Sequence, residues 1–329
     1  LDWNDRLISV SCSIGATLSP PGEIDPDTLL LQADFALYEA KQLGRARAEI
    51  YDDALHRRHS LRSQRASDLA DAIDTATLDH VFQPVLDLQS QSVIGLETLA
   101  RWTHPEAGTI GPDDFLPIAE ELGLMGALDL GSMSKALEQK HLLERGGHGG
   151  LTVSFNASSS LLAHPEFVNR LVWGVEAGGL SRDQVAIEVL ETTAFGKITE
   201  NSSHAATIRD LHDAGFKVYL DDFGVGYAGL AHLAELAVSG VKIDRSLVQN
   251  VRQDNTAAKI VRKIIELCND LGLNVVAEGV EDRHTANTLL DMGCTTVQGF
   301  WVSRPLRPED LPAWLRARST TPPLRMISG

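Results

Sequence analysis

From residue 78 onward, short apolar runs alternate with longer amphipathic segments. This pattern is typical of strands joined by helices. The strands are expected near His80–Leu86, Val93–Leu99, Thr152–Phe155, Gln184–Val189, Lys217–Leu220, Gly240–Ile243, Asn274–Ala277 and Thr296–Val297. The helices are expected at Pro112–Leu122, Ala127–Glu144, Pro165–Gly178, Glu200–Ala214, Thr256–Leu271, Arg283–Met292 and Pro308–Arg316. About eight alternating strands predict an α/β fold in which a parallel sheet closes into a (β/α)8 barrel.

The gap between the first two strands breaks this regularity. Only a few residues separate Leu86 from Val93, which is too short for a crossover helix. We therefore expect an antiparallel pair, and a modified TIM barrel that is irregular at its start.

The first 77 residues have a different pattern. Residues 7–16 alternate like a strand, and Pro26–Gly44 has the apolar spacing of a helix that stops at the glycine. Residues 1–51 thus form a small α/β unit, too short to bury a full core alone. Residues 52–77 are polar with one apolar helical face and predict a linker helix, residues 78–318 form the barrel, and residues 319–329 are expected to be a flexible tail.

Asp221 and Asp222 follow an apolar strand and precede a loop with Gly224 and Gly226. Successive strand side chains point to opposite faces, so two adjacent acids fit best where a strand ends and both can turn towards one site. Two close carboxylates repel unless a proton or a cation lies between them. The segment alone leaves two interpretations open: a divalent-metal site, or a turn that caps a helix.

The positions of other polar residues favour the metal site. Nearly every expected strand ends in one or two such residues, namely Glu97, Asn156, Glu188 with Glu191, Asp221 with Asp222, Lys242 with Asp244, Glu278 with Glu281, and Gln298. In a barrel these ends meet on one rim, where barrel enzymes hold their catalytic groups. Oxygen ligands of this kind suit hard cations such as Mg²⁺ or Mn²⁺.

The charge balance restricts the partners. The formal net charge is −16 at pH 7, which argues against binding to a nucleic acid polymer or an anionic membrane surface. No apolar run approaches the ~18 residues of a membrane span, so we expect no membrane contact by this fragment. Three cysteines without metal-type spacing indicate buried thiols in a reducing compartment, hence a cytoplasmic location. Membrane-anchoring segments before Leu1 in a longer protein are left open.

The motifs of the barrel resemble those of the EAL domain family, the cyclic di-GMP phosphodiesterases. The resemblance covers about residues 78–315 and rests on FQPVLDL, GLETLARW, NASSSLL, IEVLET, DDFGVGY, VKIDRS, VVAEGVED and GCTTVQGFW in family order. It implies metal-dependent hydrolysis of cyclic di-GMP to linear pGpG, with two Mg²⁺ or Mn²⁺ ions, inhibition by Ca²⁺, and a homodimer formed through this domain.

The resemblance also implies residue roles. Glu97, Asn156, Glu188, Asp221, Asp222 and Asp244 match metal-site positions. Glu278 and Lys242 match the catalytic positions, as general base and as the lysine beside the attacking water. The matches to substrate-site positions are Arg101, which would contact a phosphate, together with Gln83, Glu281 and Gln298. Glu191 matches the glutamate that positions the loop after Asp222.

The first fifty residues have a second resemblance. VSCSIGA, ADFALYEAKQLGRAR and a following tyrosine are similar to the C-terminal part of a GGDEF (diguanylate cyclase) domain. The signature and catalytic half of that family are absent, so this fragment is expected to have no cyclase site.

Several residues depart from the EAL pattern. Thr98 replaces the usual alanine, Leu190 a common threonine, Val225 the usual threonine, and Ala228–Gly229 a serine pair. The loss of hydroxyls near the Asp222 loop puts the turnover rate in doubt. One alternative is therefore an inactive or weak EAL domain that acts as a cyclic di-GMP receptor. Another, independent of the family, is an enolase-type barrel in which Lys242 removes a proton.

Overall fold

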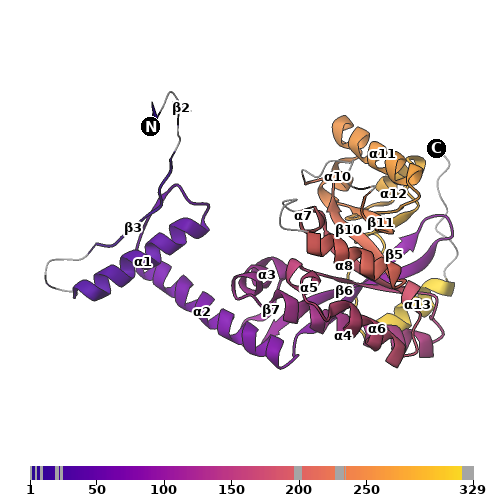
Figure 1. Cartoon of the computed structure of the whole chain (residues 1–329), viewed down its shortest axis with the longest axis horizontal. Coiled ribbons are helices and arrows are strands. Elements are labelled where there is room, and N and C mark those ends of the chain that lie inside the picture. Colours follow the sequence, from indigo (N-terminus) through magenta and orange to yellow (C-terminus); the bar gives the residue numbers. More distant parts are fainter. Residues whose placement is uncertain are drawn as a thin grey trace. The chain divides into compact units, whose positions relative to one another are not determined.

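The structure is a computed structural model that describes residues 2–3, 6–7, 10–18, 22, 25–195, 202–226, 233 and 235–320. The chain divides into two compact units, Leu1–Leu69 and Ala70–Gly329. Figure 1 labels their elements.

The first unit is built around one helix. Strands β1 (Asp2–Trp3) and β2 (Arg6–Leu7) form an antiparallel pair, and β3 (Ile14–Ala16) pairs in parallel with β4 (Ala48–Ile50) across helix α1 (Pro26–Gln42). The carboxylate of Asp25 caps α1 by accepting the amides of Asp27 and Thr28, and Gly44 follows its end at φ 102°. Helix α1 packs closely on β3, because a Cβ on Gly15 would lie 2.1 Å from the Ala33 carbonyl oxygen.

The expected strand over residues 7–16 is wrong in its extent. Leu7 belongs to β2, Ile14–Ala16 form β3, and residues 10–13 are not in a strand. Alternation fixes which side chains share a face, but a strand also needs a partner, and β4 offers only three residues. Helix α2 (Asp53–Asp74) lies within the expected linker, and the division between the two units falls inside it. The expected tail at 321–329 lies outside the described residues.

The second unit contains the predicted barrel. Its strands are β5 (Asp79–Asp87), β6 (Ser92–His104), β8 (Thr152–Asn156), β9 (Val185–Leu190), β10 (Lys217–Phe223), β11 (Gly240–Ile243), β12 (Asn274–Ala277) and β13 (Thr296–Gln298). They pair in the order β5–β13–β12–β11–β10–β9–β8–β6, and β6 returns to β5. Strand β5 is antiparallel to both neighbours, while the remaining pairs are parallel. The antiparallel start of the barrel is thus confirmed.

Strand β6 runs further than expected. It continues to His104, where β7 (Gly108–Ile110) pairs with its end as an antiparallel hairpin. Glu97 therefore lies within a strand rather than at its end, as Asp221 does within β10.

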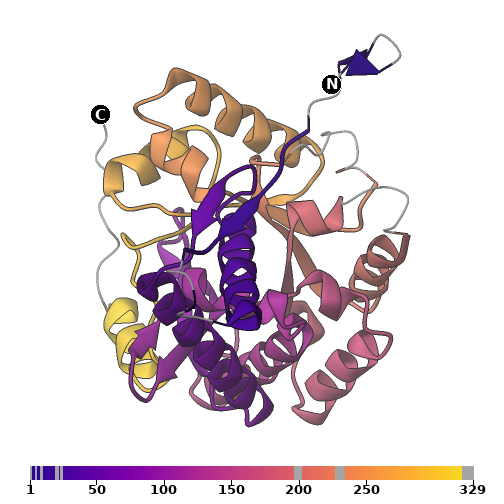
Figure 2. The ribbon, with the colours of Figure 1, turned by 90° about the vertical axis from the view of Figure 1, so that its left-hand side faces the viewer.

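Helices surround the strands of this unit (Figures 1 and 2). They are α3 (Pro112–Glu121), α4 (Met125–Arg145), α5 (Ser159–Leu162), α6 (Phe167–Ala177), α7 (Glu191–Ala194), α8 (Ser202–Asp213), α10 (Arg245–Asn250), α11 (Asn255–Asp270), α12 (Arg283–Asp291) and α13 (Leu311–Thr320), with a 3-10 turn, η1, at Arg182–Gln184. The expected helices agree with these to within a few residues at each end. Within the described residues, no helix has the length and apolar character needed to cross a membrane.

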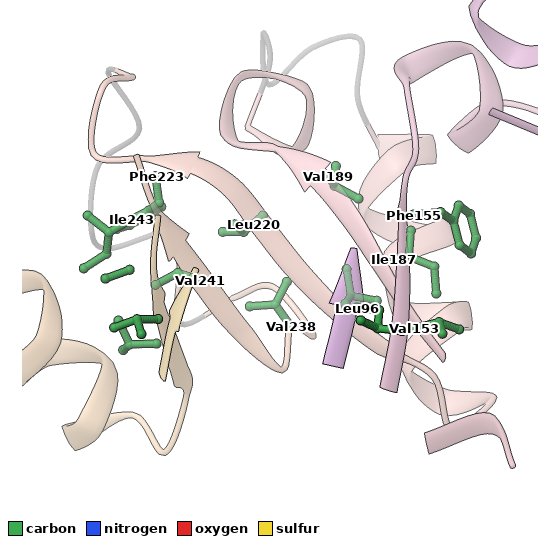
Figure 3. Close-up of a cluster of buried hydrophobic side chains, with 14 of the residues drawn as sticks. Leu96, Val153, Phe155, Ile187, Val189, Leu220, Phe223, Val238, Val241 and Ile243 are labelled. Carbon is green, nitrogen blue, oxygen red and sulfur yellow. The ribbon is translucent and has the colours of Figure 1, made fainter. Parts of the chain in front are cut away.

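The apolar core lies between the strands and the helices. The strands alternate, so Leu96, Val153, Ile187, Leu220 and Val241 are at most 1% exposed and belong to one buried cluster (Figure 3). Their neighbours in sequence point the other way, into the barrel. The apolar residues on the outer face of the strands therefore pack against the helices, and the inner face can carry polar residues.

Small residues line the interior of the barrel on the amino-terminal side of the rim. Gly95, Ser154, Ala186 and Gly240 occupy inward positions on four strands. A Cβ on Gly240 would lie 2.7 Å from the ring of Tyr219, so the glycine makes room for that ring. Such barrels are usually packed with branched residues, and this one has space inside.

Candidate active site

Lys242 is the centre of the rim. It lies on β11 and is 2% exposed. Its Nζ lies 2.5 Å from Glu188 Oε2, 2.6 Å from Glu278 Oε1, 3.3 Å from Glu97 Oε2 and 3.4 Å from Asp221 Oδ1. Four strands or strand ends thus direct carboxylates at one buried ammonium group. The positive charge of Lys242 compensates only part of the negative charge gathered around it.

This crowding shifts the ionisation of the cluster. Burial would lower the pKa of Lys242, but the surrounding carboxylates, Asp221 first, outweigh it and raise the pKa well above its usual value. Burial and the charge of Glu97 raise the pKa of Glu188 well above its ordinary value. Burial also raises the pKa of Glu278, to about 8. Burial opposes ionisation of Glu97 as well, but Lys242 and the amide of Gln298 prevail and lower its pKa.

Asp221 and Asp222 turn to the same site through a local distortion of β10. The register of β10 with β11 shifts between Leu220 and Phe223, and Asp222 has φ 53°. Oxygens of Asp221, Asp222 and Glu278 all lie within 4.8 Å of one another. Burial and the charge of Asp221 raise the pKa of Asp222 to about 6. This arrangement favours the metal-site interpretation over a capping turn.

Two amides hold Glu97 in place. Gln298 Nε2 donates to Glu97 Oε2 at 2.5 Å, and Asn156 Nδ2 lies 3.4 Å from Glu97 Oε1. Two oxygens of the cluster, Gln298 Oε1 and Asp221 Oδ1, are buried without a hydrogen-bond donor in the described structure. Buried oxygens of this kind normally have a hydrogen-bond partner. These two oxygens can therefore accept a further hydrogen bond or bind a cation.

An open cavity of about 350 Å³ lies over the cluster, and we call it the upper pocket. The sequence-predicted residues that line it are Gln83, Glu97, Arg101, Asp221, Glu278, Glu281 and Gln298. Arg101 is half-buried on β6, and its Nη1 donates to the Ala100 carbonyl at 2.7 Å. Burial lowers the pKa of its guanidinium, which nevertheless stays a cation in the physiological range. The pocket thus combines carboxylates with one arginine suited to a phosphate.

Asp244 and Glu191 lie beside the cluster. Asp244 caps α10 by accepting the amide of Ser246 at 2.9 Å, and its charge also raises the pKa of Asp222. Glu191, at the start of α7, accepts the amide of Gly224 at 2.8 Å. A Cβ on Gly226 would lie 2.4 Å from Glu191 Oε1, so this carboxylate packs directly against the loop.

The departures from the family pattern are partly visible. The side chains of Leu190 and Val225 are 41% and 60% exposed, and Ala228 and Gly229 lie outside the described residues. The hydroxyl of Thr98 is buried without a hydrogen-bond partner in the described structure. Thr98 points away from the cluster, as expected for a residue that follows an inward one.

The upper pocket has further lining residues that the strand-end pattern does not identify. Arg245, Gln249 and Phe300 lie on helix α10 or in the loop after β13. Gln249 donates to Glu281 at 3.0 Å, and the guanidinium of Arg304 lies 4.5 Å from the ring centre of Phe300. The i, i+4 spacing of Arg245 and Gln249 on a helix that follows a strand end was the available signal.

Comparisons with known proteins match most of the chain. A family model described as "EAL domain" matches residues 66–305. Among curated relatives, cyclic di-GMP phosphodiesterase NbdA of Pseudomonas aeruginosa is 32% identical over 325 residues, or 98% of this chain and 41% of NbdA. Bifunctional diguanylate cyclase/cyclic di-GMP phosphodiesterase MucR of the same organism is 32% identical over 92% of this chain and 44% of MucR. The chain thus spans less than half the length of these relatives.

Solved structures share the fold. The PaMucR phosphodiesterase in its c-di-GMP complex has a TM-score of 0.71 and 33% identity, covering 75% of this chain and 99% of that chain. Klebsiella pneumoniae BlrP1, in a manganese/cy-diGMP complex at pH 9.0, has a TM-score of 0.61 and 31% identity, covering 70% of this chain and 56% of that chain.

Proposed function

The chain belongs to the EAL domain family, and from that premise we propose that it is a metal-dependent phosphodiesterase that hydrolyses cyclic di-GMP to linear pGpG. The observation that carries the proposal is the convergence of Glu97, Glu188, Asp221 and Glu278 on Lys242 beneath an open pocket. Relatives that are named as phosphodiesterases of this substrate, and a similar structure in complex with it, support the choice of substrate.

The residues at the rim fit a divalent cation. The donors are all oxygens, and three of the carboxylates have oxygens within 4.8 Å of one another. Asp221 Oδ1 is buried and accepts no hydrogen bond in the described part of the chain, as an oxygen reserved for a cation would. We propose that Glu97, Asn156, Glu188, Asp221, Asp222 and Asp244 hold two Mg²⁺ or Mn²⁺ ions, and that Ca²⁺ inhibits.

When bound, such cations lower the pKa of a water molecule and neutralise phosphate charge. The chain's own residues would supply charge stabilisation and proton transfer. Lys242 would stabilise the negative charge that develops on the phosphate. Glu278 in its ionised form would accept the proton of the attacking water, and burial, which raises its pKa to about 8, makes that carboxylate a stronger base.

The remaining residues position the substrate. Arg101 would bind phosphate oxygens, and Gln83 and Glu281, which also line the upper pocket, would contact the substrate. Gln298 orients Glu97 through its amide, and Glu191 holds the loop after Asp222 through the Gly224 amide. Preorganised groups of this kind lower the barrier because they need no rearrangement during reaction.

A turnover assay with product identification tests the proposal. We expect pGpG to form from cyclic di-GMP when Mg²⁺ or Mn²⁺ is present, and little when EDTA or Ca²⁺ replaces it. Saturable binding of cyclic di-GMP with no pGpG after long incubation would establish a receptor instead. Absence of both binding and turnover would contradict the substrate assignment.

We further propose that residues 1–51 are the C-terminal part of a GGDEF domain, followed by a linker at 52–77 and the EAL domain at 78–318. The parallel β3–α1–β4 unit and the bifunctional relative MucR support this division. Homodimerisation through the EAL domain and a cytoplasmic location are parts of the same proposal. Analytical ultracentrifugation of the purified chain tests the dimer, and a sedimentation coefficient of a monomer at high concentration would contradict it.

A further inference from the structure

The barrel contains a second cavity below the cluster. It has a volume of about 320 Å³, opens to solvent, and we call it the lower hollow. Several of its lining residues, among them Thr152, Lys217, Asn274 and Thr296, are the first residues of parallel strands. The lower hollow therefore opens at the amino-terminal end of the barrel, opposite to the upper pocket.

Glu188 and Lys242 separate the two cavities. Both side chains line the lower hollow, and both belong to the acidic cluster beneath the upper pocket. The small inward residues Gly95, Ser154 and Ala186 also line the lower hollow, which explains the space below this ion pair. A cavity of this size is at the lower end of the range for small-molecule sites.

Among the residues that line the lower hollow, Lys217 is the charged group that lies outside the acidic cluster, because Lys242 and Glu188 pair with each other. The charged lining residues are Lys217, Lys242 and Glu188, in a chain whose net charge is −16. Lys217 is half-buried at the opening, and its Nζ lies 3.5 Å from the Thr152 hydroxyl. No carboxylate of the described residues forms an ion pair with Lys217. The ammonium group of Lys217 is therefore available to pair with a ligand carboxylate.

The walls combine apolar and hydroxyl groups. Val85 and Val276 contribute methyl groups, and the ring of Tyr219 lies across Gly240. The hydroxyl of Ser154 faces the same space, and its residue is 7% exposed. Burial raises the pKa of Tyr219, which keeps its hydroxyl neutral and able to donate a hydrogen bond.

We propose that the lower hollow is a second ligand site, which binds a small aromatic monocarboxylate with its charge at Lys217 and its ring against Tyr219, Val85 and Val276. The ring fits the apolar walls, and the carboxylate supplies the partner that Lys217 lacks. The proposal does not depend on the reaction in the upper pocket, because none of these four residues belongs to the cluster.

Titration of the full chain with benzoate in the presence of Mg²⁺, followed by calorimetry and ligand-observed NMR, tests the proposal. We expect a Kd of about 1 mM or lower and binding of neutral benzamide at least about tenfold weaker. Lys217→Met removes the charge but keeps the stem, and should weaken benzoate binding about tenfold. Lys263→Met is the matched control, because the Lys263 side chain is 76% exposed on α11, and it should leave benzoate binding unchanged.

Two further measurements locate the bound benzoate. Nuclear Overhauser effects from the benzoate ring should reach the methyls of Val85 and Val276, and not those of Leu99 in the upper pocket. Asp221→Asn should leave benzoate binding intact. The proposal is overturned if benzoate does not bind, if Lys217→Met binds it as well as the parent chain, or if Asp221→Asn abolishes binding and the contacts are to Leu99.

Discussion

Asp221 contributes a carboxylate oxygen that is buried, lies 3.4 Å from Lys242 and accepts no hydrogen bond within the described structure. An asparagine has the same shape, but it lacks the negative charge that a divalent cation requires. We expect Asp221→Asn to lower turnover of cyclic di-GMP at least about 100-fold, since charge stabilisation by a metal contributes several kcal/mol. Turnover and Mn²⁺ titration of the variant measure this effect.

Asp213→Asn serves as the control, because the Asp213 side chain is 71% exposed on α8. Parent-like turnover and Mn²⁺ affinity in Asp221→Asn would show that this carboxylate is not a metal ligand.

Substitution of Glu278 is expected to affect turnover but not substrate binding, unlike substitution of Asp221. Its carboxylate lies 2.6 Å from Lys242, and Glu278→Gln keeps an oxygen there but cannot accept a proton. We expect turnover to fall at least about 100-fold, while the affinity for cyclic di-GMP changes by less than about threefold. Binding measured by calorimetry beside turnover separates the two. Equal losses of binding and turnover would argue against a role as general base.

Thr98 tests a departure from the family pattern. Its hydroxyl is buried without a partner in the described residues, and a buried unpaired hydroxyl destabilises a fold. Thr98→Val keeps the shape and removes the hydroxyl, so we expect the free energy of unfolding to rise by about 1 kcal/mol. Urea denaturation measures it, with Thr98→Ser, which retains the hydroxyl, as the contrast. A less stable Thr98→Val variant would show that the hydroxyl has a partner.

At the residue scale, the sequence predicts which acidic residues meet at the rim better than it predicts the residues that they contact. Seven strands deliver polar groups to one rim, and the structure brings Glu97, Glu188, Asp221 and Glu278 together as expected. The exact partners depend on side-chain geometry that no pattern encodes. Phe300, for instance, follows a strand end like many loop residues, and only folding places it in the upper pocket.

At the scale of secondary-structure elements, a buried aspartate links helix α4 to helix α5. Asp129 on α4 is buried and its Oδ2 accepts the amide of Ser158 at 2.7 Å, so it ties α4 to the start of α5. Burial raises the pKa of Asp129 well above the ordinary value of an aspartate, to about 6. The folded state therefore favours the neutral acid more strongly than the unfolded chain does. Its contribution to stability is present below about pH 4 and is lost as the pH rises through about 6.

Asp129→Asn removes this dependence while keeping an acceptor for Ser158. At 1.36 kcal/mol per pKa unit, we expect the variant to be more stable than the parent by about 3 kcal/mol at pH 8, and by about half of that at pH 5. Urea denaturation at the two pH values measures the difference. A destabilised variant at pH 8 would show that the charge of Asp129 has a compensating partner.

Element types follow from the pattern, and element limits do not. The eight barrel strands and the seven expected helices have strong periodicity and lie where expected, whereas the short helices α5, α7 and α10 were not expected. Strand β4 has only three residues with a glutamate at its centre, which carries almost no signal. Strand β6 extends to His104 because β7 pairs with its end, and that hairpin is a tertiary contact invisible in the local sequence.

At the scale of the whole molecule, the chain divides into two units, and the main buried cluster lies in the second. The main buried cluster contains residues from Phe82 onward, and the family model begins at residue 66. We expect residues 70–320 alone to unfold cooperatively, with a Tm within about 5 °C of the barrel transition in the full chain. Circular dichroism and calorimetry measure this transition. An aggregated or non-cooperative fragment would show that the barrel requires the first unit.

Strand β5 closes the ring against β13, with Asp87 opposite Thr296 and a further bridge from Phe82 to Leu306. Roughly two hundred residues of chain separate these partners, so the ring is closed by a contact of very long sequence separation. On a ribosome, the β5–β6 hairpin would emerge early and wait with one edge unpaired until β13 leaves the exit tunnel. Chaperone binding during synthesis would be most valuable in that interval.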